Sequence, residues 1–349
     1  MRVLIVHPGV HFSVADVFNG LRKGLEANGC QVATYNLDDR LEFYSRAHVR
    51  GDDGTFAKAF GDEDAAQMAA IGLGDALYRY WPDILIVVSG FFIPNATWGI
   101  LKRRPHHVVY WCTESPYEDD RQGRPARYVD TVVLNDPTNL EQFRRELNPN
   151  THYFPHSYDP AVHHPGAADP ELVCDFGFVG TGFPSRIEFF EQVDWSGIDA
   201  KFGGQWRLLE PGSPLLPLLV HEQAHCMNNT VTATLYRSSR VSANLYRKEH
   251  SEQASADGWA MGPREVELAA CGTFFLREER GEGDALFPQL PVFYDPSDFE
   301  DQLRWALKHP EMCADAATAA RASIADRTFD NTAARLLRIV EQAGAKRVA

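Results

Sequence analysis

Arg264 and Glu267 stand three residues apart in a segment whose pattern predicts a short helix over about residues 263–270. This spacing places the two side chains on neighbouring parts of one helix face. Pro263 suits the first turn, and Gly262 ends the loop before it. Free N–H groups at a helix N-terminus favour a phosphate, and an arginine there adds a fork of donors for a diphosphate. Glu267, one turn further along, is expected to accept hydrogen bonds from a ribose.

A second candidate anion site lies in residues 178–186, where a strand ending at Val179 runs into a turn and then a helix. Gly180 and Gly182 in this turn would let backbone amides approach a phosphate or a sugar. Arg186 is expected in the first turn of the next helix, near the same anion. An ordinary strand–helix–strand unit with a surface Arg–Glu pair accounts for the stretch with Arg264 and Glu267 as well, so its motif alone leaves both interpretations open.

The order of these motifs resembles a known family. An Asn-Leu-x-Arg strand end at Asn244, a glycine-containing loop, Arg-x-x-Glu and then Ala-Cys-Gly resemble the C-terminal domain of the CgeB/YkvP-like glycosyltransferases, which have the GT-B fold. Residues 155–160 are similar to the family's Pro-His-x-x-Asp-Pro segment, and residues 178–186 to its Phe-x-Gly loop followed by Arg. The resemblance covers most of the chain.

The resemblance implies an α/β protein with two Rossmann-like domains, an interdomain cleft, and a C-terminal helix that packs back on the first domain. We expect an N-terminal acceptor-binding domain over residues 1–165, a nucleotide-sugar-binding domain over 166–325, and the crossing helix over 326–349. The implied donor-binding residues are Gly180, Thr181, Gly182, Arg186, Asn244, Arg247, Gly262, Arg264 and Glu267. The implied acceptor-binding residues are Gly9, His11, Phe12, Ser89, Gly90 and Glu114.

Apolar runs in the N-terminal half predict parallel strands at about 2–7, 83–89, 107–112 and 130–134, joined by helices. Functional loops of such sheets follow the carboxyl ends of the strands. Glu114 follows one strand and can hold an acceptor hydroxyl or take its proton, or else cap a helix. His11 follows the first strand, where a base of an inverting enzyme would stand, or is simply exposed. Residues 38–61 are polar and are expected to be irregular.

Composition sets limits on the class of protein. The 349 residues fit two domains, and 44% hydrophobic content is enough for two cores. No run of about 18 apolar residues predicts a membrane span, and six scattered cysteines without a CxxC pair indicate reduced thiols, so we expect a cytoplasmic protein. A net charge of −14 disfavours broad nucleic-acid binding.

Residues 221–225 read His-Glu-Gln-Ala-His and satisfy the His-Glu-x-x-His pattern of zinc proteases. The segment 217–227 is expected to place His221 and His225 at helical spacing, but no third ligand is indicated downstream. Paired acids at Asp38-Asp39 and in Glu118-Asp119-Asp120 are expected to be solvated. We therefore expect no metal and no cofactor, with the zinc hydrolase kept as an alternative.

The expected function is metal-independent transfer of a sugar from a nucleotide-diphosphate sugar to a hydroxyl, with Arg264, Glu114 and His11 as catalytic residues. The acceptor is left open among a saccharide, a protein, a small molecule and a modified DNA base. The stereochemistry also stays open, because Trp259 stands where a retaining-type Glu-x7-Glu pair would place its first Glu. A non-catalytic sugar-nucleotide-binding protein is the remaining alternative. Donor sugar, nucleotide and oligomeric state are not specified by the sequence.

Overall fold

The computed structural model describes residues 1–9, 12–103, 106–249 and 257–348. The chain forms two compact units. Unit 1 contains Met1–Phe154 and Phe329–Ala349, and unit 2 contains Pro155–His250 and Ala256–Thr328. The units divide after Phe154 rather than after residue 165. The reason is that the segment from Pro155 onward is bound to unit 2, where Arg237 donates to the carbonyl oxygen of Val162 at 3.1 Å.

Unit 1 is built on a parallel six-stranded sheet of order β2-β1-β5-β6-β7-β8. The strands are β1 (Arg2–Val6), β2 (Gln31–Tyr35), β5 (Ile84–Val88), β6 (His107–Trp111), β7 (Thr131–Leu134) and β8 (Thr151–Tyr153). β5, β6 and β7 are buried along their whole length. Strands buried on both faces read as continuous apolar runs, which is why the sequence revealed these three most clearly.

Helices cover both faces of this sheet. They are α1 (Phe12–Ala27), α2 (Leu37–Ser45), α3 (Asp62–Tyr80), α4 (Asn95–Leu101), α5 (Asp119–Ala126), α6 (Leu140–Glu146) and α13 (Phe329–Val348). One core holds side chains of α1 and α13, and the other holds side chains of α2, α3, α4 and α6. Residues 38–61, expected to be irregular, instead contain most of α2 and a hairpin of β3 (His48–Arg50) and β4 (Phe56–Lys58).

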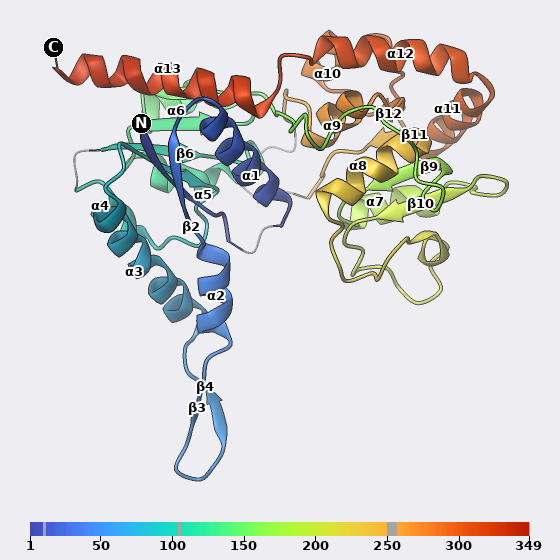
Figure 1. Cartoon of the computed structure of the whole chain (residues 1–349). Coiled ribbons are helices and arrows are strands. Elements are labelled where there is room, and N and C mark those ends of the chain that lie inside the picture. Colours follow the sequence, from blue (N-terminus) through green and yellow to red (C-terminus); the bar gives the residue numbers. More distant parts are fainter. Residues whose placement is uncertain (10–11, 104–105, 250–256, 349) are drawn as a thin grey trace. The chain divides into compact units, whose positions relative to one another are not determined.

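The C-terminal helix packs on the first unit, as predicted (Figure 1). Gly20 and Gly24 of α1 make this contact close. A Cβ at Gly20 would lie 2.2 Å from the Phe329 ring, and one at Gly24 would lie 2.4 Å from the Phe329 carbonyl oxygen. Asn28 also donates to the Asp330 carbonyl oxygen. Two glycines one helical turn apart therefore let the start of α13 lie directly on α1.

Unit 2 contains a second parallel sheet of order β10-β9-β11-β12. Its strands are β9 (Cys174–Val179), β10 (Ala200–Gly203), β11 (Ser239–Asn244) and β12 (Phe275–Arg277). Its helices are α7 (Pro184–Glu191), α8 (Asn229–Ser238), α9 (Pro263–Cys271), α10 (Gly281–Leu286), α11 (Pro296–Lys308) and α12 (Pro310–Ser323), with a 3-10 turn at Leu216–Leu218. Aromatic rings fill much of its core, including Phe176, Phe178, Phe190 and Phe202.

No helix in the described part of the chain is both long and apolar enough to cross a membrane.

Candidate active site

Arg264 lies where three elements of unit 2 meet. It is the second residue of α9, and its guanidinium lies over the Phe178 ring, 4.6 Å from the ring centroid. Its Nε donates to the carbonyl oxygen of Val179 at 2.6 Å, and its Nη1 donates to Asn244 Oδ1 at 2.7 Å. The carboxyl ends of β9 and β11 and the N-terminus of α9 thus share one fixed cation. The two stretches that sequence analysis singled out are in direct contact.

Gly180 and Gly182 were predicted to let backbone amides approach a phosphate, but in the structure they make room for side chains of the protein. A Cβ at Gly180 would lie 2.3 Å from Arg264 Nη2, and a Cβ at Gly182 would lie 2.4 Å from the Trp206 ring. Both backbone amides are already bound, since Gly180 N donates to the Gly203 carbonyl oxygen and Gly182 N to that of Gln205. The glycines therefore admit Arg264 and Trp206, while Thr181 between them is exposed.

Arg186 lies in the first turn of α7, as predicted, but its side chain is buried. Its guanidinium donates to the carbonyl oxygens of Thr181 at 3.0 Å and Leu245 at 2.6 Å. The start of α7 also binds a carboxylate of the chain, because Glu249 accepts hydrogen bonds from Ser185 N and Ser185 Oγ. Burial acts to raise the pKa of Glu249, but these hydrogen bonds lower it overall. Arg186 thus ties the turn to the end of β11.

Buried carboxylates bind the backbone of the residues that precede α9. Glu265 is fully buried, and it accepts hydrogen bonds from Gly262 N at 2.9 Å and from the Tyr246 hydroxyl. Burial raises the pKa of Glu265 to about 7, although the hydrogen bonds from Tyr246 and Gly262 oppose that rise. Glu282 accepts from Met261 N at 2.8 Å and pairs with Arg327. Two buried carboxylates therefore fix the backbone on which Gly262 and Arg264 stand.

The remaining predicted donor residues lie around this centre. Asn244 is almost fully buried beneath Arg264, and the guanidinium of Arg247 lies 5.4 Å from the centroid of the Phe183 ring. Glu267 keeps 15% of its side chain exposed, and burial raises its pKa to about 7 against the influence of Arg264. His163, which sequence analysis passed over, places its Nε2 3.9 Å from Glu267 Oε1.

In unit 1, several predicted acceptor residues gather at the carboxyl ends of β1 and β5. Gly9 has φ of +98°, and a Cβ there would lie 2.6 Å from the Phe92 ring. Ser89 is fully buried with φ of +63°, and Gly90 follows with φ of +72° against Trp98. A left-handed serine costs free energy and is uncommon, so this strand end is held in a specific shape by its surroundings.

Glu114 is positioned by side chains that sequence analysis did not select. Its backbone N–H donates to Gln122 Oε1 at 3.1 Å, and Gln122 is fully buried. Asp119 was expected to be solvated, but it accepts hydrogen bonds from Ser115 Oγ and Asn139 Nδ2. Burial raises the pKa of Asp119, and these hydrogen bonds oppose that shift. The middle residue of the acid run is therefore a structural carboxylate.

His11 and Phe12 are the other two predicted acceptor residues. His11 lies outside the described residues, and Phe12 is the first residue of α1, with only its backbone described.

The His221–His225 motif does not form the expected helix. Residues 221–227 follow an irregular path, so the two imidazoles do not share a helical face. His221 Nε2 accepts a hydrogen bond from Gly204 N at 3.0 Å, and His225 pairs with Glu222 at 3.2 Å. In the described ranges of the chain, no group of three or more His, Cys, Asp or Glu side chains is arranged to hold a metal ion. The motif is a loop contact, and it does not support the zinc hydrolase.

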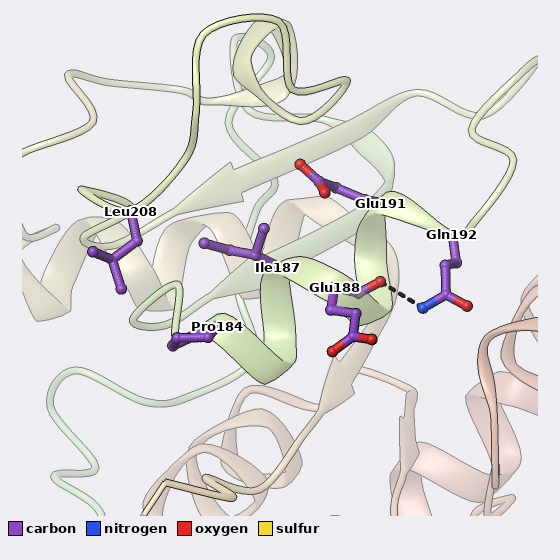
Figure 2. Close-up of a pocket in the computed structure, with 6 residues that line it drawn as sticks. All are labelled: Pro184, Ile187, Glu188, Glu191, Gln192 and Leu208. Atoms are coloured by element: carbon purple, nitrogen blue, oxygen red, sulfur yellow. Dashed lines mark hydrogen bonds between the residues drawn. The ribbon is translucent and has the colours of Figure 1, made fainter.

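A pocket of about 650 Å³ lies on another part of unit 2 (Figure 2). Figure 2 shows Ile187 and Glu188 of α7 on one side of it and Leu208 on the other. The other lining residues are Pro184, Glu191 and Gln192. None of the predicted donor residues lines this pocket, so we do not place the reaction there.

Comparison with known proteins identifies the type of domain. Residues 186–338 match the family model described as "Glycosyl transferase-like". The chain is 20% identical over 264 residues to the spore protein CgeB of Bacillus subtilis (strain 168), covering 74% of this chain and 82% of that protein. The first of these matches includes Arg264, in agreement with the motifs.

Solved structures show the fold. Sucrose-phosphate synthase from Thermosynechococcus elongatus superimposes with a TM-score of 0.66 at 12% identity, covering 99% of this chain and 100% of that chain. An alpha-glucosyltransferase in complex with UDP and a 13-mer DNA containing a HMU base superimposes with a TM-score of 0.62 at 14% identity, covering 98% and 99%. The predicted resemblance is confirmed: residues 186–338 match a glycosyl transferase-like family, the chain resembles CgeB over most of its length, and it has the GT-B fold.

Proposed function

We propose that this protein transfers a sugar from a nucleoside-diphosphate sugar to a hydroxyl acceptor without a metal ion. The observation that carries the proposal is the position of Arg264, a fixed cation at the N-terminus of α9, against Gly180. It belongs to the part of the chain that matches the glycosyl transferase-like family. An anion at this point meets both a guanidinium and the positive end of a helix.

In the proposed reaction, negative charge builds on the leaving diphosphate as the bond to the sugar breaks. Arg264 stabilises that charge, and it is already oriented by Val179 and Asn244, so it needs little reorganisation. Thr181 and Gly262 line the same anion, while Arg247 adds charge at its edge. Arg186 acts as a positioning residue, since its guanidinium is bound to carbonyl oxygens. Glu267 receives the ribose hydroxyls.

Unit 1 supplies the acceptor side in this proposal. Glu114 holds the acceptor hydroxyl or removes its proton, and the Gln122 hydrogen bond keeps its loop in place. Gly9, Ser89 and Gly90 shape the neighbouring strand ends, and His11 and Phe12 are retained as candidate acceptor contacts. The structure of the similar alpha-glucosyltransferase holds UDP and a 13-mer DNA containing a HMU base. A modified DNA base therefore joins saccharides, proteins and small molecules among the acceptors to test.

Thermal stabilisation by a panel of UDP-, GDP- and dTDP-sugars tests the donor half of the proposal. A donor at about 100 times its Kd should stabilise the folded protein by about 2.7 kcal/mol, with EDTA present throughout. Release of the nucleotide in the presence of an acceptor panel then tests transfer. Lack of stabilisation by every donor would contradict the proposal. Stabilisation without donor hydrolysis or transfer would support a non-catalytic sugar-nucleotide-binding protein instead.

A further inference from the structure

His163 lies in the segment that leads from Phe154 to β9, within unit 2. The segment is anchored on unit 2. His163 N donates to the Asp159 carbonyl oxygen at 2.8 Å, which closes a turn, and Arg237 of α8 donates to the carbonyl oxygens of Val162 and His164. Farther along, a Cβ at Gly272 would lie 3.5 Å from Pro165. The backbone around His163 is therefore fixed before the side chain makes any contact.

The imidazole of His163 is 2% exposed and lies between two helices. Its Nε2 is 3.4 Å from Oδ1 of Asn229, the first residue of α8, and 3.9 Å from Oε1 of Glu267 on α9. An amide oxygen accepts, so this Nε2 carries a hydrogen that it donates to Asn229, and the carboxylate lies at the longer distance of an electrostatic contact. A buried polar ring costs free energy unless it has such partners. The two partners explain why a histidine can stand at this buried position.

Glu267 lies within electrostatic range of a cation and 3.9 Å from this imidazole. Arg264, three residues earlier on the same helix, acts on the carboxylate through its charge, and Tyr236 and Cys271 also lie within electrostatic range. Glu267 still keeps 15% of its side chain exposed. A carboxylate with one oxygen toward His163 and a partly exposed surface has a defined orientation in which to accept hydrogen bonds from a ligand diol.

We propose that His163 is a positioning residue that orients the Glu267 carboxylate for a ribose diol, and that it thereby sets the preference for a ribonucleotide over a deoxyribonucleotide. This inference rests on the proposed function, because it assigns Glu267 to the ribose of the donor. It makes this segment of unit 2 part of the donor site. His163 touches no substrate in this proposal and acts only through Glu267.

Binding of UDP and GDP, each compared with dUDP and dGDP, tests the inference by calorimetry. His163→Leu should weaken ribonucleotide binding about tenfold and leave deoxyribonucleotide binding within about twofold, because only the former uses both hydroxyls. His163→Gln, which retains an N–H donor, should recover most of the loss. The matched control is His164→Ala, since His164 is the exposed neighbour whose Nδ1 lies beside the Pro165 carbonyl oxygen.

The double variant His163→Leu with Glu267→Gln separates coupling from general damage. If His163 acts through Glu267, the second substitution should add little to the first, so the two losses are not additive. Additive losses, or an unchanged ribose preference in His163→Leu, would overturn the inference while leaving the proposed function intact. If His163→Leu does not fold, the same comparison is made with His163→Gln and with the double variant His163→Gln with Glu267→Gln. Wild-type protein that binds none of the four nucleotides would overturn both proposals.

Discussion

The two units place their candidate residues at equivalent ends of parallel sheets but hold them with different chemistry. In unit 2, the guanidinium of Arg264 donates to the end of β9 and to Asn244 at the end of β11. In unit 1, the amide of the buried Gln122 accepts from the backbone of the loop that carries Glu114. One strand end is organised by a cation and the other by a neutral amide.

This difference indicates which ligand each unit suits. A fixed cation at a helix N-terminus favours an anion such as a diphosphate. A carboxylate on a loop whose backbone is held by a neutral amide is better suited to a hydroxyl, which it can orient or deprotonate. The glycines follow the same division. Gly180 makes room for the Arg264 guanidinium, and Gly9 makes room for the Phe92 ring. The units share a fold and differ in the charge that they present.

Removal of the cation should have the largest effect. We expect Arg264→Ala to lower transfer by about 100- to 1,000-fold, roughly the loss from one oxyanion-type contact. Because Arg264 also bonds Val179 and Asn244, the variant should lose some stability as well. Steady-state kinetics at a temperature well below the unfolding midpoint measures the first effect, and thermal unfolding measures the second.

Arg240→Ala is the matched control, because Arg240 is a half-exposed cation of β11 that pairs with Asp175. Its removal should leave transfer within about twofold, as expected for a surface ion pair. Wild-type turnover in Arg264→Ala would refute the idea that unit 2 is the cationic, donor-binding half.

Titration of the buried Glu265 carboxylate should make the stability of unit 2 depend on pH. The pKa of Glu265 is about 7 in the folded chain, above its usual value of 4.5. The unfolded chain therefore loses this proton first, and stability falls as pH rises from about 4.5 to 7, then levels off. A rise of this pKa from 4.5 to about 7 corresponds to roughly 3 kcal/mol. Glu265→Gln keeps an acceptor for Gly262 N and should remove that part of the decline.

Urea unfolding at pH 5 and pH 8 measures this effect. The matched control is Glu278→Gln, since Glu278 accepts from Tyr246 N at 2.6 Å in the same region but remains partly exposed and beside Lys248. An unchanged pH dependence in Glu265→Gln would show that the carboxylate beneath Gly262 is already ionised at neutral pH.

The main strands of both sheets and the helix that carries Arg264 were predictable, because each is encoded by a local pattern. The predicted helix 263–270 is α9 (Pro263–Cys271), and the apolar run at 83–89 contains β5. The contacts of Gly180 and Gly182 were not predictable. A glycine in sequence indicates a close approach without naming the partner, and the partners, Arg264 and Trp206, come from distant segments.

Burial explains the other departures. Asp119 belongs to a run of acids that is typical of a solvated loop, yet long-range hydrogen bonds from Asn139 and neighbouring side chains enclose it. His163 lies among prolines and small residues. Only the packing of the segment from Phe154 to β9 on α8 and α9 brings it near Glu267. The spacing of His221 and His225 suggested a helix, but Gly204 N binds the first imidazole within an irregular loop.

One glycine substitution in each unit should distinguish their roles. Each should change a different kinetic parameter by about tenfold. Gly180→Ala would place a Cβ 2.3 Å from Arg264 Nη2, so the guanidinium must move, and donor affinity should fall. Gly9→Ala meets the Phe92 ring at 2.6 Å in a left-handed backbone, so the acceptor KM should rise instead. Gly99→Ala, in open space on α4, is the control and should change neither. The same kinetic parameter changing in both variants would contradict the division of roles.

The smallest expected effect concerns the amide that holds the Glu114 loop. Gln122→Ala removes the acceptor of two backbone N–H groups, those of Thr113 and Glu114, and we expect kcat/KM for the acceptor to fall about fivefold. Donor affinity should not change, because no unit 2 contact is altered. Gln142→Ala, whose exposed amide pairs with Glu146 on α6, serves as the control. If Gln122→Ala weakened donor binding as much as acceptor use, the loop of Glu114 would serve the nucleotide, and the assignment of acceptor chemistry to unit 1 would fail.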